Sequence, residues 1–318
     1  MKRHPALSPR RWPRWLLPVF GLLLVAVTAV LAATWWEARK LLHNPPASRS
    51  VSTRTPADFG LPYRDVTLTS ADGLRLVAWY VPGPVANGNG ALIVAQHGYK
   101  SQRSEMLEEG AMLYRRGYAL LIPALRAHGR SEGEWITFGL KEADDLEGWV
   151  RYARTLPEGR HIGLLGNSFG AVLAIECAAR DPGVGAVVAH SPFSSLADTI
   201  NISVPYFTGL PAFPFANLIR FWAERRLGVR ADQIDAKSAI GRISPRPVMI
   251  LQGGADITVA PDSGQRLYDA AQDPKVLWYE PALGHTEFDT ALPAEFARRV
   301  GDFFDHALLS PRVVAKTP

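Results

Sequence analysis

Apolar and polar residues are arranged along the chain in blocks whose periods match strands and helices. Two stretches that alternate with a period of two residues, YRDVTLTS and LRLVAWYVP, flank Asp72 and Gly73, a pair typical of a hairpin turn. A continuous apolar run follows at 91–98, as is typical of a strand covered on both faces. The pattern therefore predicts a sheet that opens with a hairpin and continues into buried strands.

From residue 102 onward, helical and strand-like segments follow each other in turn. We predict helices at 102–115, 139–155, 262–271 and 291–307, and strands at 118–125, 161–165, 184–191, 246–253 and 275–281. Repeated strand–helix units with short connections predict an α/β fold with a mainly parallel, doubly wound sheet, in a domain that spans 61–308. The hairpin at its start makes the sheet mixed.

One segment interrupts this alternation. Residues 194–240 are rich in proline and aromatic residues, and they become amphipathic and helical from about Ala216 to Arg226. The segment falls where a cap over a site at the edge of the sheet would be inserted. Its aromatic content favours a cap that covers substrate over the alternative, a plain surface excursion.

The longest apolar stretch lies near the N-terminus, where residues 15–36 contain no charged side chain. A helix of about 20 residues, at about 1.5 Å per residue, covers a hydrocarbon core of about 30 Å. Tryptophans at both ends of the stretch suit the two membrane interfaces. We predict a transmembrane anchor at 15–36, after a basic tail (1–14) and before a Pro/Ser/Thr-rich linker (37–60); residues 309–318 form a second tail.

Flanking charges predict how this anchor is oriented. Five Lys or Arg residues precede it and two follow closely, so the positive-inside rule places the N-terminus in the cytoplasm and the domain on the extracytoplasmic side. A cleavable signal peptide, giving a secreted protein, is the alternative, although the stretch is long for one and Val30-Leu31-Ala32 is a mediocre cleavage site. A buried core helix would not be apolar on every face beside a basic flank.

The overall basicity belongs to the same terminus. Residues 1–45 hold seven basic side chains and one acidic one, whereas the whole chain has a net charge of +5. The domain therefore lacks the basic patch of a nucleic-acid-binding protein.

The single cysteine, Cys177, lies in an apolar helical stretch and is expected to be a structural thiol. No Cys/His cluster with zinc spacing occurs in the sequence, and we predict neither a metal site nor a cofactor.

The stretch HIGLLGNSFGAVLAIECAAR (161–180) carries the clearest chemical signal. An apolar strand, a G-x-S-x-G turn and an apolar helix form a nucleophile elbow, which holds the Oγ of Ser168 clear of the backbone. Gly166 and Gly170 are expected because a side chain at either place would collide with the adjoining strand or helix. The backbone N–H of Phe169, at the helix N-terminus, points to where an oxyanion would form. The pentapeptide alone is a weak signal, and its setting makes it informative.

A serine hydroxyl needs an imidazole to take its proton and a carboxylate to orient that imidazole. In an open parallel sheet, these groups are expected just past the carboxyl ends of strands. Asp256 follows the strand at 246–253, and His285 follows the strand at 275–281. Asp256 could instead be a turn residue or a helix cap, with Asp262 as a competitor, and His285 could be a solvated loop histidine.

Position and order nevertheless select His285 among the histidines. The others that we considered lie near the anchor, on strands or in the terminal helix: His4, His43, His161, His190 and His306. The loop after the strand at 91–98 should supply a second oxyanion donor, and the backbone N–H of Tyr99 is the candidate. We expect His97 to shape this loop rather than to transfer protons.

On these residues the chain resembles the α/β-hydrolase superfamily over about 65–308. The order Ser168, Asp256, His285 is the order of that family. The resemblance also rests on the segments HGYKSQRSEM, LRAHGRSEGEWITFG, EADDLEGWVRY, SPF, ISPRPVMILQGGAD and GH. It is greatest toward membrane-anchored or secreted bacterial hydrolases near the dienelactone-hydrolase-like and acyl-peptidase-like branches. The resemblance implies an α/β-hydrolase fold and esterase-type chemistry without a cofactor.

The chain departs from the family pattern in three places. Ala124 stands where the family commonly has the aspartate of Asp-x-Arg-Gly-His-Gly, and we expect altered loop packing there rather than lost catalysis. Gly170 is followed by Ala171, unlike the double glycine of prolyl-oligopeptidase-like peptidases, and no propeller domain is present. Serine at the elbow also differs from dienelactone hydrolase proper, which uses cysteine.

The sequence therefore predicts a membrane-anchored serine hydrolase that cleaves small-molecule carboxylic esters through an acyl-enzyme, and the aromatic cap and the nearby membrane favour an apolar, lipid-like substrate. Ser168 would be the nucleophile, His285 the general base and Asp256 the group that orients it. An amidase or peptidase on the same fold is the nearest alternative. A non-catalytic binding protein on a hydrolase fold is the alternative from another class. No nucleic-acid partner is predicted, and the oligomeric state is left open.

Overall fold

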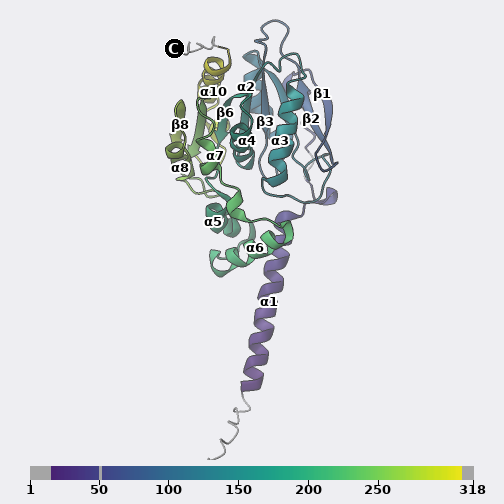
Figure 1. Ribbon diagram of the computed structural model, residues 1–318, viewed down its shortest axis with the longest axis vertical. Helices are drawn as coiled ribbons and strands as arrows, with labels where there is room; N and C mark the ends of the chain where they lie inside the picture. The colour runs from purple at the N-terminus through teal and green to yellow at the C-terminus, as the bar shows by residue number, and fades with distance from the viewer. Residues whose placement is uncertain (1–15, 50–51, 310–318) are drawn as a thin grey trace, which may run out of the picture.

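One eight-stranded sheet between two layers of helices forms the body of the protein in a computed structural model that describes residues 16–49 and 52–309 (Figure 1). The predicted basic tail at 1–14 and nearly all of the predicted tail at 309–318 lie outside the described residues. The strands are β1 Arg64–Thr69, β2 Arg75–Val81, β3 Ala91–Gln96, β4 Ala119–Pro123, β5 His161–Asn167, β6 Val184–His190, β7 Val248–Gly253 and β8 Lys275–Glu280.

Helices connect most of these strands, as the alternating pattern predicts. The α-helices are α1 Leu16–Leu42, α2 Leu107–Arg115, α3 Leu140–Ala153, α4 Phe169–Arg180, α5 Leu196–Thr208, α6 Ala212–Leu227, α7 Ala236–Ile240, α8 Ser263–Ala270, α9 Phe288–Ala291 and α10 Pro293–Leu308. Short 3-10 helices lie at Pro46–Ser48, Pro56–Phe59, Arg103–Met106 and Ala231–Gln233.

The sheet has the order β1-β2-β4-β3-β5-β6-β7-β8. Strand β2 is antiparallel to β1 and β4, and the remaining pairs are parallel. The predicted mixed, mainly parallel sheet with an opening hairpin is therefore confirmed. Its central strands β3, β5 and β6 are buried almost throughout, which explains their continuous apolar sequences.

Each face of the sheet has its own hydrophobic core. Helices α3, α4, α7 and α8 pack on one face, with Trp149 and Val172 among the buried residues. Helices α2 and α10 pack on the other face, where Leu107 and Phe304 are buried. Because alternate residues of each strand enter opposite cores, the carboxyl ends of the strands are held between two packed layers.

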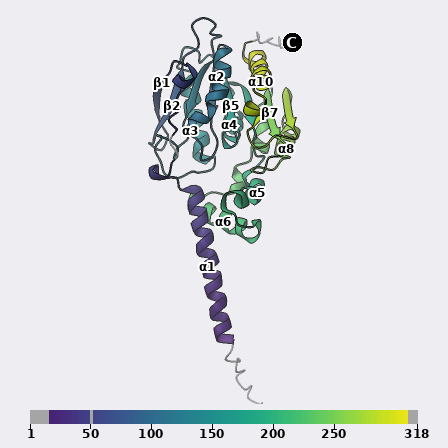
Figure 2. The ribbon, with the colours of Figure 1, turned by 180° about the vertical axis from the view of Figure 1, so that it is seen from behind.

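The first helix projects from the domain (Figures 1 and 2). It is long and apolar enough to cross a membrane by length and composition. Residues 17–29 are exposed, whereas Thr34, Ala38 and Leu42, spaced by four residues on one helix face, are buried against the domain. The helix thus continues beyond the predicted apolar segment at 15–36, and its last turns pack against the domain.

The inserted segment at 194–240 forms helices α5, α6 and α7. The helix predicted from Ala216 to Arg226 lies within α6, and α5 was not expected from the sequence. Both Figure 1 and Figure 2 show α5 and α6 at the end of the domain from which α1 projects. The insertion follows β6, so it lies at the carboxyl ends of the parallel strands.

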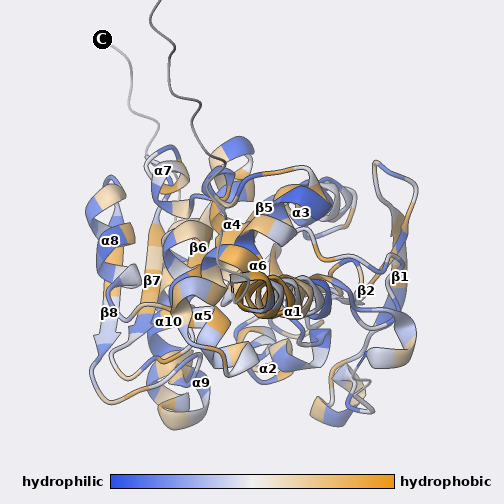
Figure 3. Cartoon of the chain, turned by 90° about the horizontal axis from the view of Figure 1, so that it is seen from below, coloured by the Kyte–Doolittle hydropathy of each residue, from blue (hydrophilic) through white to orange (hydrophobic). Residues whose placement is uncertain are grey.

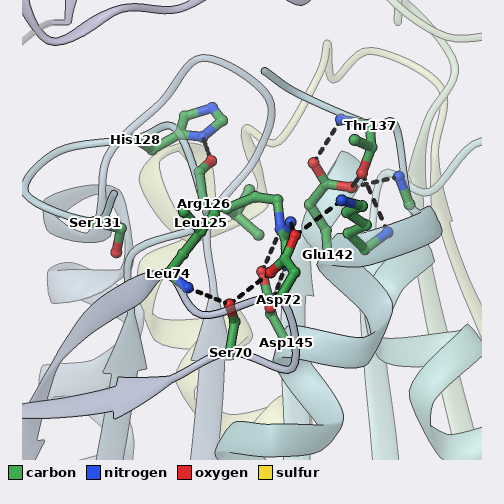
Figure 4. A network of polar contacts seen from close by, with 12 residues as sticks. Ser70, Asp72, Leu74, Leu125, Arg126, His128, Ser131, Thr137, Glu142 and Asp145 are labelled. Carbon is green, nitrogen blue, oxygen red and sulfur yellow. Dashed lines mark hydrogen bonds and ion pairs between the residues drawn. The ribbon is translucent and has the colours of Figure 1, made fainter. Parts of the chain in front are cut away.

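A buried ionic network holds the loop after β4 (Figure 4). The guanidinium of Arg126 donates to both carboxylate oxygens of Asp145, at 2.6 and 2.7 Å, and to those of Asp72, at 2.9 and 3.1 Å. Arg126 and Asp145 are both buried. Ala124, at the start of this loop, is buried, and the buried ion pair of the loop comes from Arg126.

Replacing Arg126 by methionine is expected to destabilise the protein by about 3 kcal/mol, because Asp145 would remain buried without its partner. Thermal and urea denaturation of the detergent-solubilised chain measure the loss. Arg298→Met is the matched control, since this arginine is exposed and its pairs with Glu295 and Asp302 lie at the surface and should contribute about 0–1 kcal/mol. Equal losses for the two variants would contradict the role given to Arg126.

Candidate active site

The turn between β5 and α4 holds a serine in an unusual backbone conformation. Ser168 has φ +53° and ψ −115°, a region that residues other than glycine rarely occupy. A Cβ added at Gly166 would lie 2.2 Å from the carbonyl oxygen of Gly170, and one added at Gly170 would lie 2.2 Å from that of Gln96. The predicted reason for both glycines is confirmed, because the turn packs directly against β3 and α4.

Two residues from later loops meet Ser168. The Nε2 of His285 lies 2.8 Å from the Oγ of Ser168, and its Nδ1 lies 2.6 Å from the Oδ2 of Asp256. With the proton on Nδ1, the imidazole donates to Asp256 and its Nε2 accepts from the serine hydroxyl. The structure thus brings together the three residues whose order in the sequence suggested a common site.

Asp256 uses its two oxygens for different purposes. Its Oδ1 accepts hydrogen bonds from the backbone N–H groups of Thr258, at 2.8 Å, and Val259, at 3.0 Å, while its Oδ2 faces His285. The turn role considered for this residue and its contact with the imidazole therefore coexist. The competing carboxylate of Asp262 is exposed and pairs with Arg266 instead, at 2.7 Å.

Both residues proposed to supply oxyanion donors lie beside Ser168. Phe169 is the first residue of α4, and the first N–H groups of a helix have no acceptor within it. Tyr99 lies in the loop after β3, and its ring stacks on Phe138 with centroids 5.1 Å apart. Tyr99, Phe169 and Ser168 line one cavity. The assignment of the two N–H groups stays a prediction.

Two buried histidines fix the loops around this cavity. The Nε2 of His97 accepts from the backbone N–H of Leu125 at 3.1 Å, and the Nε2 of His128 accepts from that of Lys100 at 3.0 Å. Burial lowers the pKa of His97 to about 3 and that of His128 to about 4, so both are neutral at pH 7. His97 shapes its loop as expected. The matching role of His128 was not recognised in the sequence.

Most of the cavity wall is apolar. Its lining comes from the loops after β3, β4, β5 and β6, from α1, α5, α6 and the segment after α6, and from the turn after Asp256: Ala38, Leu41, Leu42, Tyr99, Phe138, Phe169, Phe193, Ile200, Val204, Phe207, Ile219, Leu227, Ile234 and Val259, among others. The contribution of α1 was missed in the sequence. Apolar residues that continue with helical spacing after Trp36, through Ala38 to Leu42, were the available signal.

A second polar group lies on the α2 side of the sheet. His190 Nδ1 is 3.1 Å from Glu109 Oε1, and both side chains are fully buried. Burial raises the pKa of Glu109 to about 8 and lowers that of His190 to about 4, so the pair is uncharged at pH 7. With Asp289, these residues offer donor atoms within 4.8 Å of one another, a spacing at which a metal ion could be held. The backbone carbonyl of His190 accepts from the N–H of Ser168 at 2.8 Å, so the end of β6 is bonded directly to the turn that holds the serine.

The raised pKa of Glu109 predicts a pH-dependent stability. Its contribution is fully present below the ordinary carboxyl pKa of 4.5 and is lost as pH rises toward about 8. We expect the melting temperature of the wild type to fall relative to that of Glu109→Gln between pH 5 and pH 8.5. Glu108→Gln, on the same helix but partly exposed, is the control. A constant difference between wild type and Glu109→Gln would contradict the prediction.

Comparison with known proteins gives consistent matches. Residues 62–208 match the model of the X-Pro dipeptidyl-peptidase (S15) family. An uncharacterized protein of Mycobacterium tuberculosis is 28% identical over 274 residues, which cover 85% of this chain and 88% of that protein. WAV2 of Arabidopsis thaliana, an alpha/beta hydrolase domain-containing protein, is 28% identical over 276 residues, covering 82% of this chain and 84% of its own length.

Solved structures extend the comparison to the fold. The Pyrococcus furiosus esterase Pf2001 superposes with a TM-score of 0.69 and 28% sequence identity, covering 84% of this chain and 98% of the esterase. The alpha/beta hydrolase GrgF of Penicillium superposes with a TM-score of 0.62 and 20% identity, over 79% of this chain and all of that one, and this likeness concerns the fold alone.

Proposed function

Because the chain belongs to the α/β-hydrolase superfamily and is a hydrolase of the ester or peptide type, we propose that it cleaves carboxylic esters through a serine acyl-enzyme. The hydrogen-bonded chain from Ser168 through His285 to Asp256 is the observation that carries this proposal. The similarity of the domain to the Pyrococcus furiosus esterase, and the apolar cavity at Ser168, support it.

In the proposed reaction, the Oγ of Ser168 attacks the ester carbonyl carbon while His285 Nε2 takes the hydroxyl proton. The negative charge that develops on the carbonyl oxygen is stabilised by the N–H groups of Phe169 and Tyr99. The bond to the alcohol oxygen then breaks, and His285 gives its proton to the departing alcohol, which leaves an acyl group on Ser168. Water attacks this acyl group with His285 again as base, the carboxylic acid leaves, and the serine regains its proton.

Asp256 has a positioning role in this scheme. Its buried carboxylate fixes the proton on Nδ1 of His285 and stabilises the imidazolium that forms during attack. Its second oxygen is held by two backbone N–H groups, so the carboxylate cannot turn away from the imidazole. These steps use side chains and backbone groups of the chain itself, and we propose that no metal or cofactor takes part.

A peptidase acting on free peptide amino termini is the second candidate, because the matching family model is that of X-Pro dipeptidyl-peptidases. A charged amino terminus would need a carboxylate partner in the cavity. Among the described residues that line it, Glu224 is the only carboxylate, and it already accepts from Arg220 at 2.8 Å and from the N–H of Ala231 at 2.9 Å. The cavity lining therefore favours an uncharged, apolar ester.

We further propose that α1 is an uncleaved membrane anchor, with the N-terminus cytoplasmic and the domain on the extracytoplasmic side. The length and composition of the helix support a membrane span, and its flanking charges support this orientation. Burial of Ala38 and Leu42 against the domain gives the end of the helix a structural role beyond anchoring.

Ser168→Ala is expected to abolish hydrolysis of p-nitrophenyl esters, with a loss of about 10⁶ in kcat, because no other group replaces the nucleophile. It should equally abolish labelling by a fluorophosphonate. Assays of the purified full chain with acetyl to palmitoyl esters and matching anilides measure both reactions. Faster cleavage of the anilides than of the matching esters by the wild type would favour the peptidase. Unchanged ester turnover in Ser168→Ala would refute the proposal.

Asp256→Asn should lower kcat by about 10⁴, because the amide favours the wrong imidazole tautomer. Asp262→Asn is the matched control, since this carboxylate is exposed and pairs with Arg266 outside the site. Its kcat should remain near that of the wild type. A large loss for Asp262→Asn, or none for Asp256→Asn, would show that the orienting carboxylate has been assigned wrongly.

A further inference from the structure

The helix that leaves the domain as a membrane span also forms a wall of the cavity at Ser168. Ala38, Leu41 and Leu42, in the last turns of α1, line this cavity together with Ser168 itself. Helices α5 and α6, which we call the cap helices, form the facing wall with Ile200, Val204, Phe207 and Ile219. The space beside the serine is therefore bounded by the span on one side and by the cap helices on the other.

Contacts spread over two turns hold α1 in this position. Ala38 is buried with Val204, Ala216 and Ile219 of the cap helices. Nearer the apolar part of the span, Trp222 of α6 donates its Nε1–H to Thr34 Oγ1 at 3.2 Å. Figure 3, a view from below, shows α1 nearly end-on near the middle of the domain, beside α6 and α5.

Hydrogen bonds to backbone carbonyls join the last turn of α1 to the loops of the site. The hydroxyl of Tyr99 donates to the carbonyl of Leu41 at 2.6 Å. The N–H of Ile136 donates to the carbonyl of Leu42 at 2.8 Å. Because Tyr99 also carries the predicted oxyanion donor, the end of the span is fixed directly to the loop that would bind the reacting carbonyl.

The level of the membrane surface follows from the aromatic residues of α1. Trp35 and Trp36 are exposed, and tryptophans at the end of a span lie in the interface between lipid and water. They directly follow Thr34, which is bonded to α6. The cap helices must therefore lie at the same depth as this interface.

Exposed aromatic side chains on the cap helices fit that position. Phe213 is 81% exposed, and Tyr206, Phe207 and Phe221 are exposed by 52%, 45% and 48%. In water such a group of large apolar side chains is unfavourable, whereas aromatic rings are stable at the lipid interface. Phe207 both lines the cavity and is exposed, so the cavity wall continues into this aromatic surface.

We propose that the cavity takes the acyl chain of a membrane-resident lipid ester, which enters from the bilayer surface beside the exposed Phe207 of the cap helices. The inference rests on the proposed esterase function and adds its substrate class. An acyl chain needs only apolar walls, which α1 and the cap helices supply, while its ester carbonyl reaches Ser168 at the inner end. The span thereby acts as part of the substrate site as well as an anchor.

The test uses the full chain reconstituted in phosphatidylcholine vesicles, with 4-methylumbelliferyl oleate in the bilayer and the soluble butyrate ester as reference. Leu41→Trp should fill the cavity from the α1 side and lower the oleate-to-butyrate rate ratio roughly tenfold. Leu23→Trp makes the same change on the exposed part of the helix and should leave the ratio unchanged. Fluorophosphonate labelling of Ser168 verifies that each variant is folded.

Phe213→Glu provides a second variant that does not disturb the packed interior. A charge at this exposed position should weaken contact with the bilayer and lower the same ratio several-fold. Val85→Glu, which likewise replaces an exposed apolar side chain by a carboxylate, in the loop before β3, is its control. That loop lies at the amino ends of the parallel strands, away from α1.

The outcomes separate the two proposals. Hydrolysis of butyrate without hydrolysis of oleate, or equal ratios in Leu41→Trp and Leu23→Trp, would overturn the acyl-chain site and leave the esterase intact. Absence of both hydrolysis and labelling in the wild type would overturn the esterase function and, with it, this inference. A selective fall of the ratio in both Leu41→Trp and Phe213→Glu would support the acyl-chain site.

Discussion

The close approach of the serine turn to β3 and α4 is the constraint on which the site depends. Ser168 has a positive φ, and such backbone strain persists only where the surrounding structure enforces it. Here the enforcement comes from Gly166 and Gly170, which allow backbone to touch backbone, and from the bond of the serine N–H to the carbonyl of His190. Any residue with a Cβ at either glycine would move the serine hydroxyl away from His285.

Neutral polar groups buried beneath this turn keep the loops in place. His97 and His128 accept hydrogen bonds from backbone N–H groups, and burial keeps both uncharged near neutral pH. Glu109 and His190 form an uncharged pair on the opposite side of the sheet. The site is thus surrounded by groups that add directional bonds without adding charge to a low-dielectric region, where an unpaired charge would be costly.

The C-terminal end of the first helix, α1, is packed into the domain and is not a separate attachment to it. Its last turns are buried, and they share a cavity with the predicted nucleophile. Residues 43–49 then run along the loop after β4, where Asn44 donates to the carbonyl of Ala127 and Arg49 donates to those of Gly129 and Ser131. The N-terminal helix, the cavity at Ser168 and the loop network are therefore joined by direct contacts.

The sequence by itself predicted most of the elements and the residues of the candidate site. Periods of two and 3.6 residues predicted the strands and most helices, because each reports which face of a local segment is buried. The serine turn, and the positions of Asp256 and His285 just past strand ends, predicted which side chains meet, because parallel strands end at one edge of a sheet. Only the tertiary structure decided the packing of α1 on α6, the walls of the cavity and the pairing of Glu109 with His190. These contacts join residues far apart in the chain. The hydrophobic periodicity of a segment predicts which of its faces is buried, but it does not predict which other element packs against that face.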